Sequence, residues 1–261
     1  MKPVHALAGS VLLALVSSSS IAAEASAAGA KVSAAGTKPF TRNVAIVVYE
    51  GVELLDFAGP TEVFTSAAGF GARGEKGKEE EAFRVYTVAV SKAPITSQGM
   101  LKVMPEFSID DAPAPDIVVL PGGNSKAMTE DPKFMAWIER VSKATEVNMS
   151  VCTGAFVWAK LGLLDGKSST TWYGATDKLQ AAAPKSTVQE GRRLVDNGHV
   201  LTTAGVSAGI DGALHLVARL LGRQVADKTA QYMEYHWTPE AYLAKGYVAT
   251  LTEAPPAHAS K

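Results

Sequence analysis

EVNMSVCTGAFVWAKLGLL, from Glu146 to Leu164, is the most informative stretch of this 261-residue chain. It opens with a β-type run, Val147 to Val151, and continues as an apolar helix that begins near Thr153. The chain contains a single cysteine, Cys152, which falls at the turn between these two elements. A strand that turns sharply into a helix, with a nucleophile at the bend, is typical of a nucleophile elbow.

The chemistry of Cys152 has two interpretations. A helix N-terminus presents free N–H groups and a partial positive charge, which favour a thiolate over a thiol and predict a reactive cysteine. The alternative is a structural cysteine, because free cysteine is among the residue types most often buried. The surrounding sequence decides between the two.

Length and charge limit the class of protein. A chain of 261 residues is long enough for one large α/β domain, and its formal net charge is -1. No basic stripe or polybasic run predicts binding to nucleic acid or to an anionic membrane. After the N-terminus, no apolar run approaches the roughly 20 residues of a membrane-spanning helix.

The N-terminus has the composition of a targeting segment. A short basic start is followed by an apolar core, Leu7 to Val16, and by small residues that suit cleavage after Ala23 or Ala27. We therefore expect a signal peptide over 1–27, a flexible linker over 28–41, one domain over 42–236 and a tail over 237–261. The mature protein is predicted to be periplasmic or secreted, where one cysteine forms no intramolecular disulfide.

Buried strands alternate with helices along the domain. Near-continuous apolar runs at Asn43 to Tyr49, Asp116 to Leu120 and Val147 to Val151 suit parallel strands that are covered on both faces. The pattern predicts an α/β fold, a flavodoxin-like three-layer sandwich with a mostly parallel central sheet. We expect a long helix from Ala204 to Leu221 that packs across this sheet.

Two loops are expected at the carboxyl edge of the sheet, where open α/β sheets bind ligands. Pro60 suits the first turn of a helix, so Asp56 is predicted to lie in the loop after the first strand. Gly122 and Gly123 follow Leu120 and let backbone N–H groups approach a ligand, although an ordinary tight turn has the same composition.

Four segments resemble those of a known superfamily. They are LLDFAGPTEVF (54–64), DIVVLPGG (116–123), SVCTGAFVWAKLGLLDG (150–166) and TTAGVSAGIDGALHLVARLLG (202–222). With these segments the chain resembles the PfpI superfamily, which has the class I glutamine amidotransferase-like fold and includes the parkinsonism-associated protein deglycase. The resemblance runs from about Asn43 to Tyr235 and is greatest to the isonitrile hydratase branch. It also extends to the ligand-sensing domains of AraC-type transcription regulators.

The resemblance implies a set of site residues. Cys152 matches the nucleophile of isonitrile hydratases, Asp56 their acid and Thr153 their functional threonine. One position differs: the family often has a histidine where this chain has Trp172, and tryptophan offers an indole N–H and an aromatic face but no base. Without this histidine, we expect a cysteine–carboxylate mechanism rather than a protease-like one.

We therefore expect an enzyme that hydrates or hydrolyses a small electrophile such as an isonitrile. The Thr153 and Gly123 N–H groups would hold developing negative charge, and Gly122 and Trp172 would line the site. The resemblance implies a homodimer; no cofactor is expected, and no residue pair has metal-ligand spacing. Two alternatives stay open: a periplasmic ligand-binding or redox-sensing protein without turnover, and a glyoxalase- or deglycase-like enzyme.

Overall fold

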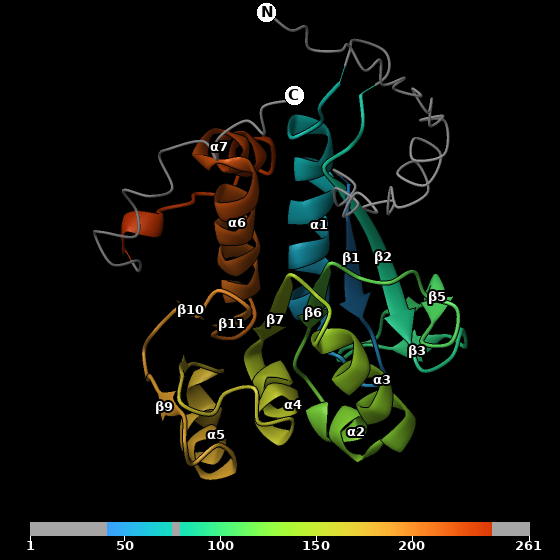
Figure 1. Ribbon diagram of the computed structural model, residues 1–261, viewed down its shortest axis with the longest axis vertical. Helices are drawn as coiled ribbons and strands as arrows, with labels where there is room; N and C mark the ends of the chain where they lie inside the picture. The colour runs from blue at the N-terminus through green and yellow to red at the C-terminus, as the bar shows by residue number, and fades with distance from the viewer. Residues whose placement is uncertain (1–40, 75–78, 242–261) are drawn as a thin grey trace, which may run out of the picture. The chain divides into compact units, whose positions relative to one another are not determined.

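A seven-stranded sheet forms the centre of the computed structural model, which describes residues 41–74 and 79–241 (Figure 1). The strand order is β10-β11-β7-β6-β1-β2-β5. The strands are β1 (Arg42–Val47), β2 (Phe83–Ala89), β5 (Phe107–Ser108), β6 (Ile117–Leu120), β7 (Val147–Val151), β10 (Leu194–Asp196) and β11 (Val200–Thr203).

All strand pairs of this sheet are parallel except β10 with β11, which is antiparallel. Every residue of β6, β7 and β11 is buried, as expected for parallel strands with helices on both faces. The predicted flavodoxin-like α/β sandwich with its mostly parallel sheet is therefore confirmed.

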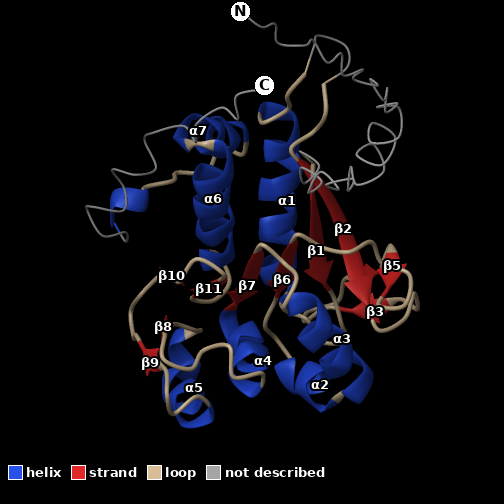
Figure 2. Ribbon diagram, in the orientation of Figure 1, coloured by secondary structure: helices blue, strands red, loops and turns tan. Residues whose placement is uncertain are grey.

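Helices cover the sheet on both faces (Figure 2). On one face lie α1 (Leu54–Phe70), α6 (Ala208–Leu221) and α7 (Arg223–Tyr232), which contact one another. The other face carries α2 (Ser125–Glu130), α3 (Pro132–Ser142), α4 (Ala155–Lys160) and α5 (Thr176–Ala182). Smaller elements complete the fold: β3 (Ile95–Thr96) pairs antiparallel with β4 (Lys102–Val103), and β8 (Ser168–Ser169) pairs parallel with β9 (Thr187–Val188).

The strand order places the candidate site. The chain passes from β1 to β2 on one side and then crosses back to β6 on the other, so the direction of winding reverses between β1 and β6. Ligands of open α/β sheets bind outside the carboxyl ends of the strands at such a reversal. The segments that leave β1, β6 and β7 carry Asp56, Gly122 and Cys152, and they all meet at this edge.

Two predicted helix boundaries were wrong. Helix α1 begins at Leu54 rather than near Pro60, so Asp56 lies in its first turn instead of a loop, and Pro60 lies inside the helix. Helix α6 begins at Ala208 rather than Ala204, because Val206 has a φ of 55° that no α-helix accommodates. The turn before α6 is held by the bond from the Val206 N–H to Asp56, a contact that periodicity does not reveal.

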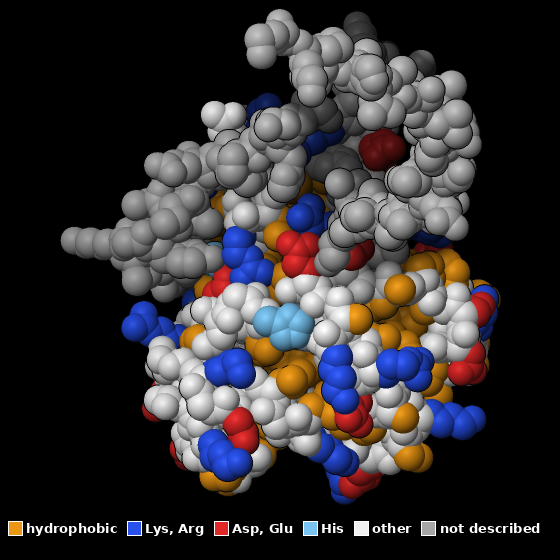
Figure 3. All heavy atoms as spheres, in the orientation of Figure 1, with side chains coloured by type: hydrophobic (Ala, Val, Ile, Leu, Met, Phe, Trp, Pro, Cys, Tyr) orange, Lys and Arg blue, Asp and Glu red, His pale blue; other side chains and the backbone are white. Residues whose placement is uncertain are grey.

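Several predictions lie outside the described residues. The signal peptide over 1–27, nearly all of the linker over 28–41 and most of the tail over 237–261 are among them, and they stay predictions. Within the described ranges, the helices are too short or too polar to cross a bilayer. Lysine and arginine mix with aspartate and glutamate on the face in Figure 3, as the near-zero net charge suggests.

Trp237 lies just beyond the predicted domain boundary and nevertheless packs into the hydrophobic core. It is 9% exposed, and the Arg223 guanidinium lies 4.9 Å from the centre of its ring. We expect Trp237→Ala to lower the free energy of unfolding by about 3 kcal/mol, measured by urea denaturation. Tyr232→Ala, at an exposed aromatic, is the control and should change it by about 0.5 kcal/mol or less. Equal effects of the two substitutions would contradict this packing.

Candidate active site

Cys152 occupies the sharp turn between β7 and a short 3₁₀ turn, Cys152–Gly154, that leads into α4. Its φ is 57°, a left-handed conformation that is uncommon outside glycine. Backbone bonds hold it there: the Cys152 N–H donates to the Ala204 carbonyl at 3.1 Å, and the Thr171 hydroxyl donates to the Cys152 carbonyl at 2.7 Å. The predicted elbow is therefore present, with the thiol 7% exposed.

Asp56 is fully buried beside this thiol, although its side chain is ionisable. Its two carboxylate oxygens accept one backbone hydrogen bond each, from the Gly122 N–H at 2.8 Å and from the Val206 N–H at 2.9 Å. The Cys152 thiol lies within hydrogen-bonding reach of the same carboxylate. The structure therefore brings together the two residues for which the resemblance implies acid and nucleophile.

Burial changes how this pair holds its protons. Desolvation raises the pKa of Asp56 to about 7, against the lowering effect of the Gly122 and Val206 N–H bonds. Desolvation, followed by the nearby Asp56 charge, raises the pKa of Cys152 to about 12. The expectation that the helix N-terminus favours a thiolate at Cys152 was therefore wrong. At neutral pH the pair therefore holds a thiol beside an acid that is close to half ionised.

The two glycines after β6 allow the loops to approach each other closely. A Cβ at Gly122 would lie 2.7 Å from the Cys152 Cβ, the Thr153 nitrogen and the Thr153 hydroxyl. Gly123 has a φ of 108° and donates its N–H to the Thr153 hydroxyl at 3.2 Å. Gly122 and Gly123 therefore do lie at the nucleophile. Their N–H groups are already bonded, Gly122 to Asp56 and Gly123 to Thr153, so Gly122 helps to hold the acid.

The backbone N–H of Thr153 and its hydroxyl both lie near the Cys152 sulfur, where they lower the thiol pKa against the stronger effect of burial. This position suits the expected role of Thr153 in holding developing negative charge or in positioning water. The Thr153 hydroxyl also donates to the Gly123 carbonyl at 3.3 Å.

Trp172 stands at the mouth of the site and is 37% exposed. A Cβ at Gly205 would lie 2.6 Å from the indole Cδ1 and 3.3 Å from the Cys152 sulfur, so indole and sulfur are close neighbours. No histidine of the described residues replaces the family's histidine here. His199 bonds to Asn148 near the start of β7, away from the carboxyl edge, and His215 bonds to Asp196.

Val206 and Tyr49 were not predicted as site residues. The Val206 N–H holds Asp56, and the Tyr49 hydroxyl donates to the Gly122 carbonyl at 2.6 Å. Val206 acts through its backbone N–H, and Tyr49 acts through its phenol just after the end of β1. Sequence patterns do not identify either group. The GVSAG run (205–209) was the available signal for Val206, because it lies in a segment that carries the resemblance.

An ion pair stabilises the turn that contains Val206. Arg193 bonds to the Asp211 carboxylate in the first turn of α6 and also donates to the Ser207 hydroxyl at 3.0 Å. The Tyr235 hydroxyl donates to the same Asp211 carboxylate at 3.1 Å. Because Asp211 is buried, this hydrogen-bond network stabilises the segment whose Val206 N–H donates to Asp56.

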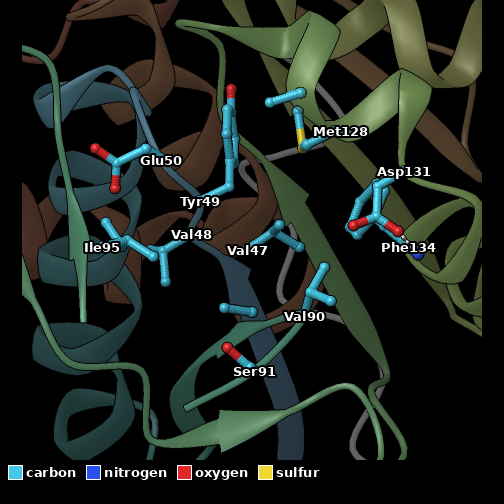
Figure 4. A pocket seen from close by; sticks show the side chains of 12 residues that line it. Val47, Val48, Tyr49, Glu50, Val90, Ser91, Ile95, Met128, Asp131 and Phe134 are labelled. Atoms are coloured by element: carbon cyan, nitrogen blue, oxygen red, sulfur yellow. Dashed lines mark hydrogen bonds between the residues drawn. The ribbon is translucent and has the colours of Figure 1, made fainter. Parts of the chain in front are cut away.

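A hollow of about 210 Å³ lies at the carboxyl ends of β1 and β2, and neither Cys152 nor Asp56 lines it (Figure 4). Its lining is mostly apolar, and the ring of Tyr49 forms part of it. In the close-up the Tyr49 hydroxyl points away from Val47 and Val90, and Gly122 accepts its hydrogen bond. Across the described ranges, no group of three or more potential metal ligands is found.

Together, the fold and the site define a class: a flavodoxin-like α/β protein with a buried carboxylate beside an elbow cysteine. Residues 42–219 match the DJ-1/PfpI family, and the chain belongs to that family. The relation to PfpI proteins expected from the sequence is therefore confirmed.

Relatives within this family differ in function. The chain is 28% identical to an isonitrile hydratase of Pseudomonas putida over 197 residues, which is 75% of this chain and 79% of that protein. It is 23% identical over 205 residues to the transcriptional regulator GbdR of Pseudomonas aeruginosa, covering 77% of this chain and 54% of the regulator. A ThiJ/PfpI protein of Pseudomonas syringae superposes with a TM-score of 0.66 at 25% identity, over 81% of this chain and 85% of that one.

The raised Asp56 pKa predicts a pH dependence of stability. Asp56 has a higher pKa folded, about 7, than its ordinary 3.8, so the folded protein binds the proton more tightly. Its contribution to stability is therefore present below about pH 4 and is lost as pH rises to 7, by up to about 4 kcal/mol. Asp56→Asn removes this loss. The free energy of unfolding of the variant minus that of the wild type should therefore increase from pH 5 to pH 8. A constant difference in urea denaturation at the two pH values would contradict the burial argument.

Proposed function

We propose that this protein is a cysteine-dependent hydratase or hydrolase of a small carbon electrophile, with an isonitrile as the first substrate to test. The observation that supports the proposal most is the buried pair of Cys152 and Asp56, whose carboxylate is held by two N–H groups. Burying a carboxylate without a positively charged partner costs free energy. Asp56 lies beside the Cys152 thiol, where it can act as the base for this nucleophile. The similarity to the Pseudomonas putida isonitrile hydratase suggests the substrate.

The first step uses the pair as thiol and carboxylate. The Cys152 sulfur forms a bond to the terminal carbon of the isonitrile while the thiol proton passes to the Asp56 carboxylate. The protonated Asp56 then gives this proton to the same carbon, so the product is a thioimidate and the carboxylate is restored. A base with a pKa of about 7 is well matched to this transfer at neutral pH.

The second step consumes one water molecule. Asp56 takes a proton from the water while the water oxygen bonds to the thioimidate carbon, and it then passes that proton to the nitrogen. As the carbon–sulfur bond breaks, Asp56 carries the hydroxyl proton to the departing sulfur, which releases an N-substituted formamide and restores the Cys152 thiol. The Thr153 N–H and hydroxyl, both close to the sulfur, would stabilise charge that develops there.

A ligand-binding protein without turnover is the second candidate. Trp172 in place of the family's histidine and the similarity to the regulator GbdR favour it. The high thiol pKa argues against rapid redox sensing, because the thiolate is the species that oxidises. A glyoxalase- or deglycase-like activity has less support, because no histidine of the described part of the chain is placed beside Cys152. A homodimer stays a prediction from the resemblance.

Turnover separates these candidates. We expect the wild type to convert an alkyl or aryl isonitrile to its formamide, measured by chromatography, and we expect Cys152→Ala to abolish turnover. Asp56→Asn should lower kcat by about 100-fold or more, because it removes the proton carrier. Asp227→Asn, on the exposed face of α7, is the matched control and should keep full activity. Absence of turnover in the folded wild type, or turnover that survives Cys152→Ala, would contradict the proposal.

A further inference from the structure

We propose that the site selects electrophiles that carry a flat, uncharged apolar substituent, which lies against a wall formed by Trp172, Tyr173 and Val206. We call these three residues the aromatic wall. The proposal relies on Cys152 as the nucleophile of the proposed function, but it does not depend on turnover. The aromatic wall therefore determines which electrophiles react fastest with the Cys152 sulfur.

The side chains of the aromatic wall are exposed to solvent. Trp172 is 37% exposed, Tyr173 77% and Val206 39%, although large apolar side chains gain free energy when water is excluded from them. The rings of Trp172 and Tyr173 lie 4.8 Å apart between centroids and are inclined by 57°. An exposed apolar group of this kind beside a nucleophile suits the apolar part of a ligand.

The Trp172 indole is held in a fixed position by its packing. A Cβ at Gly174 would lie 2.5 Å from the Trp172 ring, and a Cβ at Gly205 would lie 2.6 Å from it. The indole therefore lies against backbone at two points where only glycine leaves enough room. The Cβ at Gly205 would also lie 3.3 Å from the Cys152 sulfur, so the wall begins next to the reacting atom.

The backbone of Val206 has an unusual conformation. A φ of 55° is a strained state for a β-branched residue, and such strain persists only where the surroundings impose it. Here the Val206 N–H bonds to Asp56, and the adjacent Ser207 hydroxyl is held by Arg193. The same turn that fixes the acid therefore leaves the Val206 side chain 39% exposed, directly after Gly205, against which the indole packs.

The chemistry of the wall defines the ligand. Its three side chains carry no charge, and the nearby Arg193 guanidinium, which donates to Ser207, is paired with Asp211. A neutral ring therefore gains most, because it can stack on Trp172. Contacts between aromatic rings favour binding by about 3- to 10-fold beyond the effect of buried area.

Two thiol reagents with the same reactive group test this selectivity. N-phenylmaleimide and N-methylmaleimide both add the Cys152 sulfur across their C=C bond, with the thiol proton passing to the neighbouring carbon. The second-order rate constants of both reagents are measured by mass spectrometry of the full chain and divided by those of glutathione. The corrected ratio, phenyl over methyl, then reports the wall and not the intrinsic reactivity.

We expect a corrected ratio of about 5 for the wild type and about 1 for Trp172→Ala and Trp172→His. Trp172→Phe keeps a flat ring and should retain at least half of the preference. Tyr232→Ala removes another exposed aromatic, which pairs with Phe70 at the far end of α1 from Asp56, and should keep the wild-type ratio. Thermal unfolding of each variant confirms that it is folded.

Three outcomes would overturn the proposal: a wild-type ratio near 1, a preference that survives Trp172→Ala, or a Cys152 that reacts with neither reagent. Failure of the proposed function has a different signature. A protein that prefers the phenyl reagent but turns over no isonitrile supports the aromatic wall and refutes the hydratase.

Discussion

The burial of one carboxylate is the constraint on which the site depends. Asp56 is fully buried, so its oxygens must be satisfied by the protein, and each receives one backbone N–H. These donors come from Gly122, in the loop after β6, and from Val206, in the turn before α6. One side chain in the first turn of α1 therefore connects this helix to two loops that are far apart in the sequence.

The local irregularities of the fold follow from this constraint. The turn before α6 bends through a strained Val206, and α6 begins only at Ala208. The same desolvation that requires these hydrogen bonds also gives Asp56 a pKa near neutrality, which a general base at neutral pH needs. Structure and chemistry at this edge of the sheet therefore have a common cause.

The fold was predictable from sequence because its signals are local. Runs such as DIVVL (116–120) are apolar enough to be read as buried parallel strands, and the Cys152 turn has a strand before it and a helix after it. The identity of Asp56 came from the resemblance. Its position in a helix and the high pKa of Cys152 did not follow from the sequence, because both depend on distant backbone groups and on burial. Helix-terminus reasoning gave the thiol the wrong direction because desolvation outweighs the effect of nearby N–H groups.

The most direct test of the account is the pH dependence of Cys152 alkylation by iodoacetamide in the wild type and in Asp56→Asn. If Asp56 is the base for a protonated thiol, the wild-type rate should rise through about pH 7, following ionisation of the carboxylate. In Asp56→Asn this rise should disappear, and the rate should increase only as the thiol itself ionises at higher pH. A rate that follows an ordinary thiol pKa of about 8.5 in both proteins would contradict the coupling of the pair.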